Sequence, residues 1–108
     1  MRLRVYVAGP YSLGDPQTNT DQAIDVGERI TQMGADPFVP HLNHYRNLRH
    51  AHDNQHWLDE DLRWLAVCDA LYRMPGASKG ADGEVAYAKA HGIPVFYDLK
   101  ALAELVQS

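Results

Sequence analysis

The sequence predicts an α/β fold: a small doubly wound sheet of the flavodoxin or Rossmann-like kind, with about four parallel strands and helices on both faces. Short apolar runs, often β-branched, alternate with stretches of helical periodicity. No repeat, linker or low-complexity segment interrupts the alternation. Because 108 residues are enough for one domain and too few for two, we expect residues 1–108 to form a single domain.

The first strand and helix have clear boundaries. Leu3–Ala8 (LRVYVA) is an apolar, β-branched run that predicts a buried strand. A loop containing glycine and proline follows up to residue 19. Thr20–Met33 predicts a helix because apolar residues recur three and four positions apart, and Gly34 follows as a terminating glycine. A threonine or asparagine at positions 18–20 could cap its start.

The second strand and helix are separated by a long polar segment. Ala35–Val39 (ADPFV) predicts an edge strand, because Pro37 lacks the N–H group that an inner strand donates. Pro40–Asp53 predicts a loop, and its many aromatic and imidazole rings suit a lid over a ligand. Asn54–Val67 predicts the second helix, with Asp53 as its cap.

The last third of the chain repeats the same alternation. Asp69–Met74 predicts the third strand, and Pro75–Ala81 is a glycine- and serine-containing loop. Asp82–His91 predicts the third helix, Ile93–Tyr97 the fourth strand and Leu99–Val106 the last helix. Ligands of doubly wound sheets bind at the carboxyl ends of the strands. Three loops are therefore candidates for the site, at residues 9–19, 40–53 and 75–82.

Composition and charge exclude several classes of function. The net charge of −4 and the isoelectric point near 5.8 argue against a nucleic-acid partner, which would require a basic face. No apolar run approaches the roughly 18 residues of a membrane span. The N-terminal residues lack a signal-peptide cleavage pattern. A single cysteine, Cys68, fits a reducing compartment, so we expect a cytoplasmic protein.

Glu84 is the first candidate catalytic residue. It follows a loop of small residues, and we expect it in the first turn of the third helix. There the helix dipole would favour its ionised form, and an ionised carboxylate at a ligand site can act as a nucleophile. The alternative is a glutamate that only complements the dipole, in a loop that is only a tight turn.

Asp61 is the second candidate. It falls within the apolar stripe of the second helix, and a charge buried without a partner is costly. One explanation is proton transfer, since burial raises the pKa of a carboxyl toward neutrality. The other is an aspartate at the edge of the stripe that bonds a loop N–H.

Aromatic residues and histidines supply further candidates. Tyr6 could hydrogen-bond a carboxylate and Tyr11 could stack on a planar base, although such residues are more commonly core or surface aromatics. Five of the six histidines fall between residues 41 and 56. Their spacing matches no zinc motif, so we expect no metal and no cofactor, and a metal-dependent enzyme is the least favoured hypothesis.

Three segments resemble the nucleoside 2-deoxyribosyltransferase superfamily, which includes the 2′-deoxynucleoside 5′-phosphate N-hydrolases and the CMP-type N-glycosidases. They are VYVAGPYS, WLDEDLRWLAVCDALYRMPG and SKGADGEVAYAKAHGIPV. The most specific part is Ser-x-Gly-x-x-Gly-Glu, at Ser78 to Glu84, after Asp-x-x-Trp-Leu, which begins at Asp61.

The resemblance implies roles for individual residues. Glu84 would be the nucleophile, Tyr6 would orient it, and Asp61 would act near the departing base. Implied substrate contacts, to which we add Tyr11 and His44 from their chemistry, are Gly9, Pro10, Ser78 and Gly80. The serine at position 78 favours a nucleotide, whereas the loop PYSLGD lacks the arginine that the hydrolases use for phosphate; Arg46, Arg49 or Lys79 would have to compensate.

The sequence therefore predicts an N-glycosidase that acts on a nucleoside or its 5′-monophosphate, through a covalent glycosyl-glutamate. A deoxyribosyltransferase and a nucleotide-binding module without turnover are the alternatives. Many members of the superfamily complete their sites with a neighbouring subunit, so the resemblance also implies a homodimer or a larger assembly.

Overall fold

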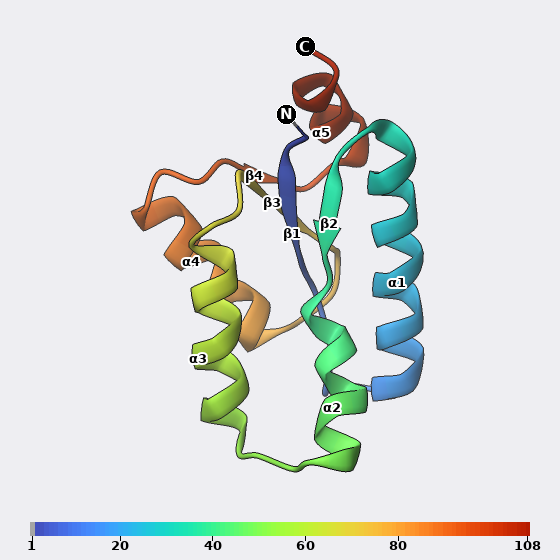
Figure 1. Ribbon diagram of the computed structural model, residues 1–108, viewed down its shortest axis with the longest axis vertical. Coiled ribbons are helices and arrows are strands. Elements are labelled where there is room, and N and C mark those ends of the chain that lie inside the picture. The colour runs from blue at the N-terminus through green and yellow to red at the C-terminus, as the bar shows by residue number, and fades with distance from the viewer. Residues whose placement is uncertain (1) are drawn as a thin grey trace.

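The computed structural model describes residues 2–108 and contains one sheet of four parallel strands in the order β2-β1-β3-β4 (Figure 1). This arrangement confirms the predicted fold class. The strands are β1 (Arg4–Ala8), β2 (Asp36–Phe38), β3 (Ala70–Arg73) and β4 (Val95–Phe96). In β1, Tyr6 is opposite Phe38 of β2 on one side and Leu71 of β3 on the other. The prediction that Pro37 marks an edge strand is confirmed, because β2 pairs with β1 alone.

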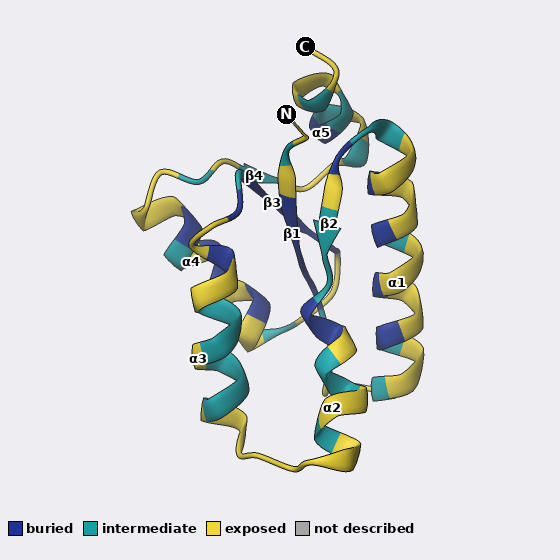
Figure 2. Ribbon diagram, in the orientation of Figure 1, coloured by how far each residue is buried: buried dark blue, intermediate teal, exposed yellow. Residues whose placement is uncertain are grey.

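Helices cover both faces of the sheet. The helical segments are α1 (Pro16–Met33), the 3-10 turn η1 (Pro40–Leu42), α2 (Asn43–Arg49), α3 (Asn54–Leu65), α4 (Lys79–Ala90) and α5 (Leu99–Val106). Successive residues of β1 point to opposite faces. Val5 and Val7 pack in one core cluster with residues of α1 and α5, whereas Tyr6 and Ala8 pack in a second with residues of α3 and α4. Figure 2 shows buried residues on the strands and on the helix sides that face them.

Two helices begin earlier than the sequence predicts, because residues outside the predicted helices cap them. Asp15, not a residue at positions 18–20, caps α1: its carboxylate accepts from the backbone N–H of Thr18 at 3.2 Å. Ser78 caps α4, since its Oγ accepts from the N–H of Ala81 at 3.1 Å. The predicted cap Asp53 on α3 and the predicted bounds of α5 are confirmed.

The interpretation of residues 40–53 as a loop is wrong for most of its length. η1 and α2 occupy residues 40–49, and α2 lies beside α3 at one end of the sheet (Figure 1). The sequence of α2, NHYRNLR, lacks an apolar stripe, and the helix buries none of its residues. Polar contacts therefore have to hold it in place.

The ends of β1 and β3 approach each other closely. The backbone N–H of Met74 donates to the carbonyl of Ala8 at 2.7 Å, and a Cβ built on Gly9 would lie 2.9 Å from Cβ of Met74. Only glycine fits there without displacing its neighbour. This contact brings the first and third candidate loops together. Among residues 2–108, no helix is long and apolar enough to cross a membrane.

Candidate active site

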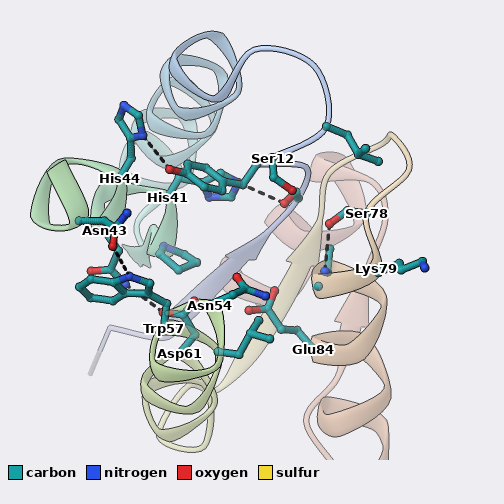
Figure 3. A pocket seen from close by; sticks show the side chains of 18 of the residues that line it. Ser12, His41, Asn43, His44, Asn54, Trp57, Asp61, Ser78, Lys79 and Glu84 are labelled. Atoms are coloured by element: carbon teal, nitrogen blue, oxygen red, sulfur yellow. Dashed lines mark hydrogen bonds between the residues drawn. The ribbon is translucent and has the colours of Figure 1, made fainter. Parts of the chain in front are cut away.

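A cavity of about 710 Å³ opens where the three candidate loops meet (Figure 3). Its walls come from the β1–α1 loop, from η1, α2 and α3, and from the start of α4. The lining residues are Gly9, Tyr11, Ser12, Leu13, Pro40, His41, Asn43, His44, Asn47, His52, Asn54, Trp57, Leu58, Asp61, Ala77, Ser78, Lys79, Gly80, Ala81 and Glu84. Both candidate carboxylates, from different helices, face this one space.

Glu84 lies deeper in α4 than the sequence predicts. The helix begins at Lys79, so Glu84 is in its second turn and not in its first. The helix dipole acts over the first turn, and the expectation that it keeps Glu84 ionised is therefore wrong. The residue is only 8% exposed, and burial raises the pKa of its carboxyl to about 7.

Two neighbours favour the charged form of Glu84. The hydroxyl of Tyr6 donates to Oε2 of Glu84, and the guanidinium of Arg73 is close enough to lower the carboxyl pKa. Tyr6 is fully buried in β1, and its own pKa is raised well above 10 by burial and by Glu84. Tyr6 thus stays protonated, and its hydroxyl bonds Oε2 of Glu84 and not Oε1.

Asp61 faces the cavity from α3. Burial raises its pKa to about 8, with smaller contributions from the charges of Glu84 and Glu60. Asn43 of α2 donates from Nδ2 to Oδ1 of Asp61 at 3.0 Å. Of the two interpretations that the sequence left open, the carboxyl that holds a proton near neutrality fits this partly buried environment, and the partner of Asp61 is a side-chain amide.

The other predicted contacts divide into those that line the cavity and one that does not. Gly9, Tyr11, His44, Ser78 and Gly80 line it, and the hydroxyl of Tyr11 lies 2.7 Å from Nδ1 of His44. Pro10 is not among the lining residues. Its carbonyl and that of Gly9 accept from Nε2 of His41, which is 5% exposed.

The three basic residues expected to compensate for the missing arginine differ in position. Lys79 lines the cavity, whereas Arg46 and Arg49 do not. Arg46 pairs instead with Glu60, with 2.6 Å between Nη1 and Oε2. Lys79 is therefore the one of the three that borders the cavity; it is exposed at the start of α4, and its side chain extends away from Glu84 and Asp61 (Figure 3).

The histidine-rich segment does not gather around one point. Within residues 2–108, no three histidine, cysteine, aspartate or glutamate side chains are grouped as a metal site requires. His52 and His56 stack on each other with ring centroids 4.0 Å apart, and both contact the ring of Trp57 edge-on. His52 and Trp57 thus form an aromatic wall of the cavity.

Sequence reasoning missed the roles of Trp57 and Arg73. Trp57 belongs to the apolar stripe of α3, and such a residue is more often part of the core. Arg73 is a charged residue in a strand that is buried at all four positions. A charged residue in an otherwise apolar strand is rare without a partner, and this could have marked it as a candidate. Its Nη2 donates to Asp82 at 2.9 Å, and its Nη1 donates to the carbonyl of Met74.

Comparison with known proteins places the chain in a family. Residues 3–98 match the model of a family described as a domain of unknown function (DUF7768). The chain belongs to this family. None of the curated proteins matches it.

Two solved structures share its fold. One is a 2-deoxyribosyltransferase from Bacillus psychrosaccharolyticus, with a TM-score of 0.62 and 16% identity over 85% of this chain and 69% of the other. The second is a 2-deoxyribosyltransferase from Leishmania mexicana, with a TM-score of 0.63 and 22% identity over 86% of this chain and 61% of the other. The DUF7768 chain thus has the 2-deoxyribosyltransferase fold and spans under two thirds of the length of the second protein.

Proposed function

We propose that this protein cleaves the bond between base and sugar in a nucleoside or nucleoside 5′-monophosphate, through a covalent glycosyl-Glu84 intermediate. The observation that carries the proposal is that two carboxylates, buried Glu84 and partly buried Asp61, face one cavity from different helices. The shared fold of two deoxyribosyltransferases supports an enzyme of this kind. Glycosidic bonds break through a transition state with oxocarbenium character, and a carboxylate pair suits that chemistry.

In the first step, Oε1 of ionised Glu84 attacks the anomeric carbon as the glycosidic C–N bond breaks. The electron pair of that bond goes to the base nitrogen, and the proton of Asp61 neutralises the departing base. The pKa values favour this division, because Asp61, at about 8, holds its proton when Glu84, at about 7, has begun to lose its own. A positioned proton donor contributes about 10²–10⁴-fold in rate.

In the second step, water attacks the anomeric carbon and Asp61, now ionised, accepts a proton from it. The bond between the sugar and Glu84 breaks, which releases the free sugar and restores the Glu84 carboxylate. A second base in place of water would make the enzyme a deoxyribosyltransferase by the same route. Tyr6 supports both steps because it bonds the Glu84 oxygen that does not attack.

A 5′-phosphate would fit near the start of α4. Lys79 supplies a cation there, and Ser78 and Gly80 line the same part of the wall. The positive end of a helix of 12 residues points to this region. We therefore prefer a nucleotide over a nucleoside as substrate.

The test is to incubate the protein with a panel of nucleosides and 5′-monophosphates and to detect free base by chromatography. Glu84→Ala should abolish base release and leave ligand binding largely intact, and mass spectrometry of the intact wild type should show an added sugar. Glu104→Gln, an exposed acid on α5, is the control and should match the wild type. If the wild type binds nucleotides but releases no base from any of them, the chain is a binding module of the same fold. A homo-oligomeric state and a cytoplasmic location stay predictions.

A further inference from the structure

Polar contacts attach the short helix α2 to the helix that carries Asp61. Nη1 of Arg46 donates to Oδ1 of Asn43 at 3.0 Å and to Oε2 of Glu60 at 2.6 Å. Asn43 in turn donates to Asp61 at 3.0 Å. The guanidinium carbon of Arg46 also lies 4.9 Å from the centre of the Trp57 ring, within cation–π range. Since α2 buries no residue, these polar contacts, and not a hydrophobic core, hold the helix in place.

The chain of contacts fixes which way the Asn43 amide faces. An arginine can only donate, so the Asn43 atom that meets Arg46 has to be its carbonyl oxygen. The NH₂ group of Asn43 must then face Asp61. An amide donor satisfies Oδ1 of Asp61 as an acceptor, which favours the carboxyl proton on the other oxygen, Oδ2.

We propose that Arg46 and Asn43 are positioning residues that direct the proton of Asp61 toward the departing base. This inference rests on the proposed function and extends it to α2. Arg46 does not line the cavity, so it acts through Asn43 and Asp61 and not on the substrate.

The test separates substrates by the charge of their base. Breaking the bond to a neutral purine places negative charge on the base unless a proton is supplied, whereas an N7-methylated purine already carries a positive charge and departs as a neutral molecule. Guanine nucleotides and nucleosides and their N7-methyl forms are suitable probes. A variant that only misdirects the proton should lose rate on the first and not on the second.

The variants are Asn43→Ala and Arg46→Met, with Arg46→Lys as the conservative change. We expect kcat on the unmethylated substrate to fall by about 10- to 100-fold in both, part of the general-acid contribution, and kcat on the methylated substrate to change by less than about threefold. Arg46→Lys should recover most of the loss, because one nitrogen makes both contacts. Gln17→Ala is the control: it breaks a 2.9 Å bond between α1 and Tyr45 of α2 without touching Asn43, and should affect both substrates equally.

A pH profile gives a second measurement that does not depend on the amount of folded protein. Asp61 is faced by Glu84 from α4, by Tyr6 from β1, by Arg46 and Asn43 from α2, and by Glu60 from its own helix. Asn43 and Arg46 both stabilise the charged form of Asp61, so Asn43→Ala and Arg46→Met should shift the basic limb of kcat to higher pH. Glu60 has the opposite effect, so Glu60→Gln should shift that limb to lower pH.

The outcomes separate the two proposals. Equal losses on both substrates, with no shift of the basic limb, would overturn the positioning role while the wild-type activity upholds the proposed function. A wild type that releases base from none of the nucleosides and 5′-monophosphates in the panel overturns both. Selective loss on the unmethylated substrate, with recovery in Arg46→Lys, supports the role of α2.

Discussion

At the scale of single residues, the candidate site depends on how the protein holds a charge on Glu84 in a buried place. Burial alone opposes ionisation, and the Tyr6 hydroxyl and the Arg73 guanidinium act against it from β1 and β3. Each comes from a strand and reaches the face of the sheet that α4 covers. The pKa of Glu84, the proposed nucleophile, is thus lowered from the sheet beneath it, while that of Asp61 is influenced from α2 and α3.

Tyr6→Phe removes a single hydroxyl from this arrangement. The hydrogen bond to Glu84 lowers the pKa of that carboxyl, so its loss raises the pKa further. Because the proposed mechanism requires Glu84 to be ionised, the acid limb of kcat/KM should move up by about one pH unit or more, the value of one hydrogen bond to a charged group. A pH–rate profile of base release measures the shift. An acid limb that stays in place would show that Tyr6 does not hold the nucleophile.

Substitutions of Arg73 and of Asp82 should shift the acid limb of the pH–rate profile in opposite directions. Arg73→Met removes a buried cation that favours ionised Glu84, so the acid limb should move to higher pH. Asp82→Asn leaves Arg73 in place but removes the anion paired with it, so the limb should move to lower pH. The Asp82 side chain is 72% exposed, and its change should cost little stability. Shifts in the same direction for both variants, in the same pH–rate assay, would contradict this account.

At the scale of elements, periodicity and glycine positions were enough to predict the strands and most helices, because each buries an apolar face. The predicted helices that later supply the two carboxylates are present, and the last helix has the predicted bounds. The helix α2 could not be predicted in this way, since none of its residues is buried and its contacts with other elements are with side chains 10 to 33 positions away. The position of Glu84 was misjudged because Ser78 caps α4 and the helix begins at Lys79, three residues before the predicted start at Asp82.

Substitution of two glycines tests how tightly the ends of β1 and β3 are packed. Gly9→Ala would place a Cβ 2.9 Å from Met74 at the contact between the ends of β1 and β3, and should lower the free energy of unfolding by about 1–3 kcal/mol. Gly83→Ala, in the interior of α4 with no neighbour within 4 Å, is the matched control. It should raise stability by about 0.5–1 kcal/mol, since alanine favours a helix. Urea unfolding of both variants measures the difference, and a harmless Gly9→Ala would mean that the contact is not tight.

At the scale of the whole molecule, the fold brings together residues that the sequence keeps far apart. Tyr6 and Glu84 are 78 positions apart, and Asn43 and Asp61 are 18 apart. The order of strands and helices predicts that the loops at the carboxyl ends of the strands meet. It does not predict which side chain bonds which, because those pairs depend on helix starts and on α2. The family resemblance implies the pairing of Tyr6 with Glu84, whereas the bond between Asn43 and Asp61 is seen only in the packed structure.

This packing has a consequence for stability as pH changes. Glu84 and Asp61 have pKa values of about 7 and about 8 in the folded chain, raised from 4.5 and 3.8. Between the unfolded and the folded pKa of each group, the folded state holds a proton that the unfolded state has released. Raising the pH from about 4 to about 8 therefore lowers the free energy of unfolding. The shift of Glu84 alone corresponds to about 3 kcal/mol.

Glu84→Gln removes this titration and keeps the shape of the side chain. Its stability should fall less than that of the wild type between about pH 5 and about pH 8, and at the upper end it should exceed that of the wild type. Urea unfolding at the two pH values measures both quantities, and Glu104→Gln, an exposed acid on α5, should follow the wild type. If Glu84→Gln is no more stable than the wild type at about pH 8, burying this carboxylate carries no cost, and the physical reason for regarding Glu84 as a functional residue is lost.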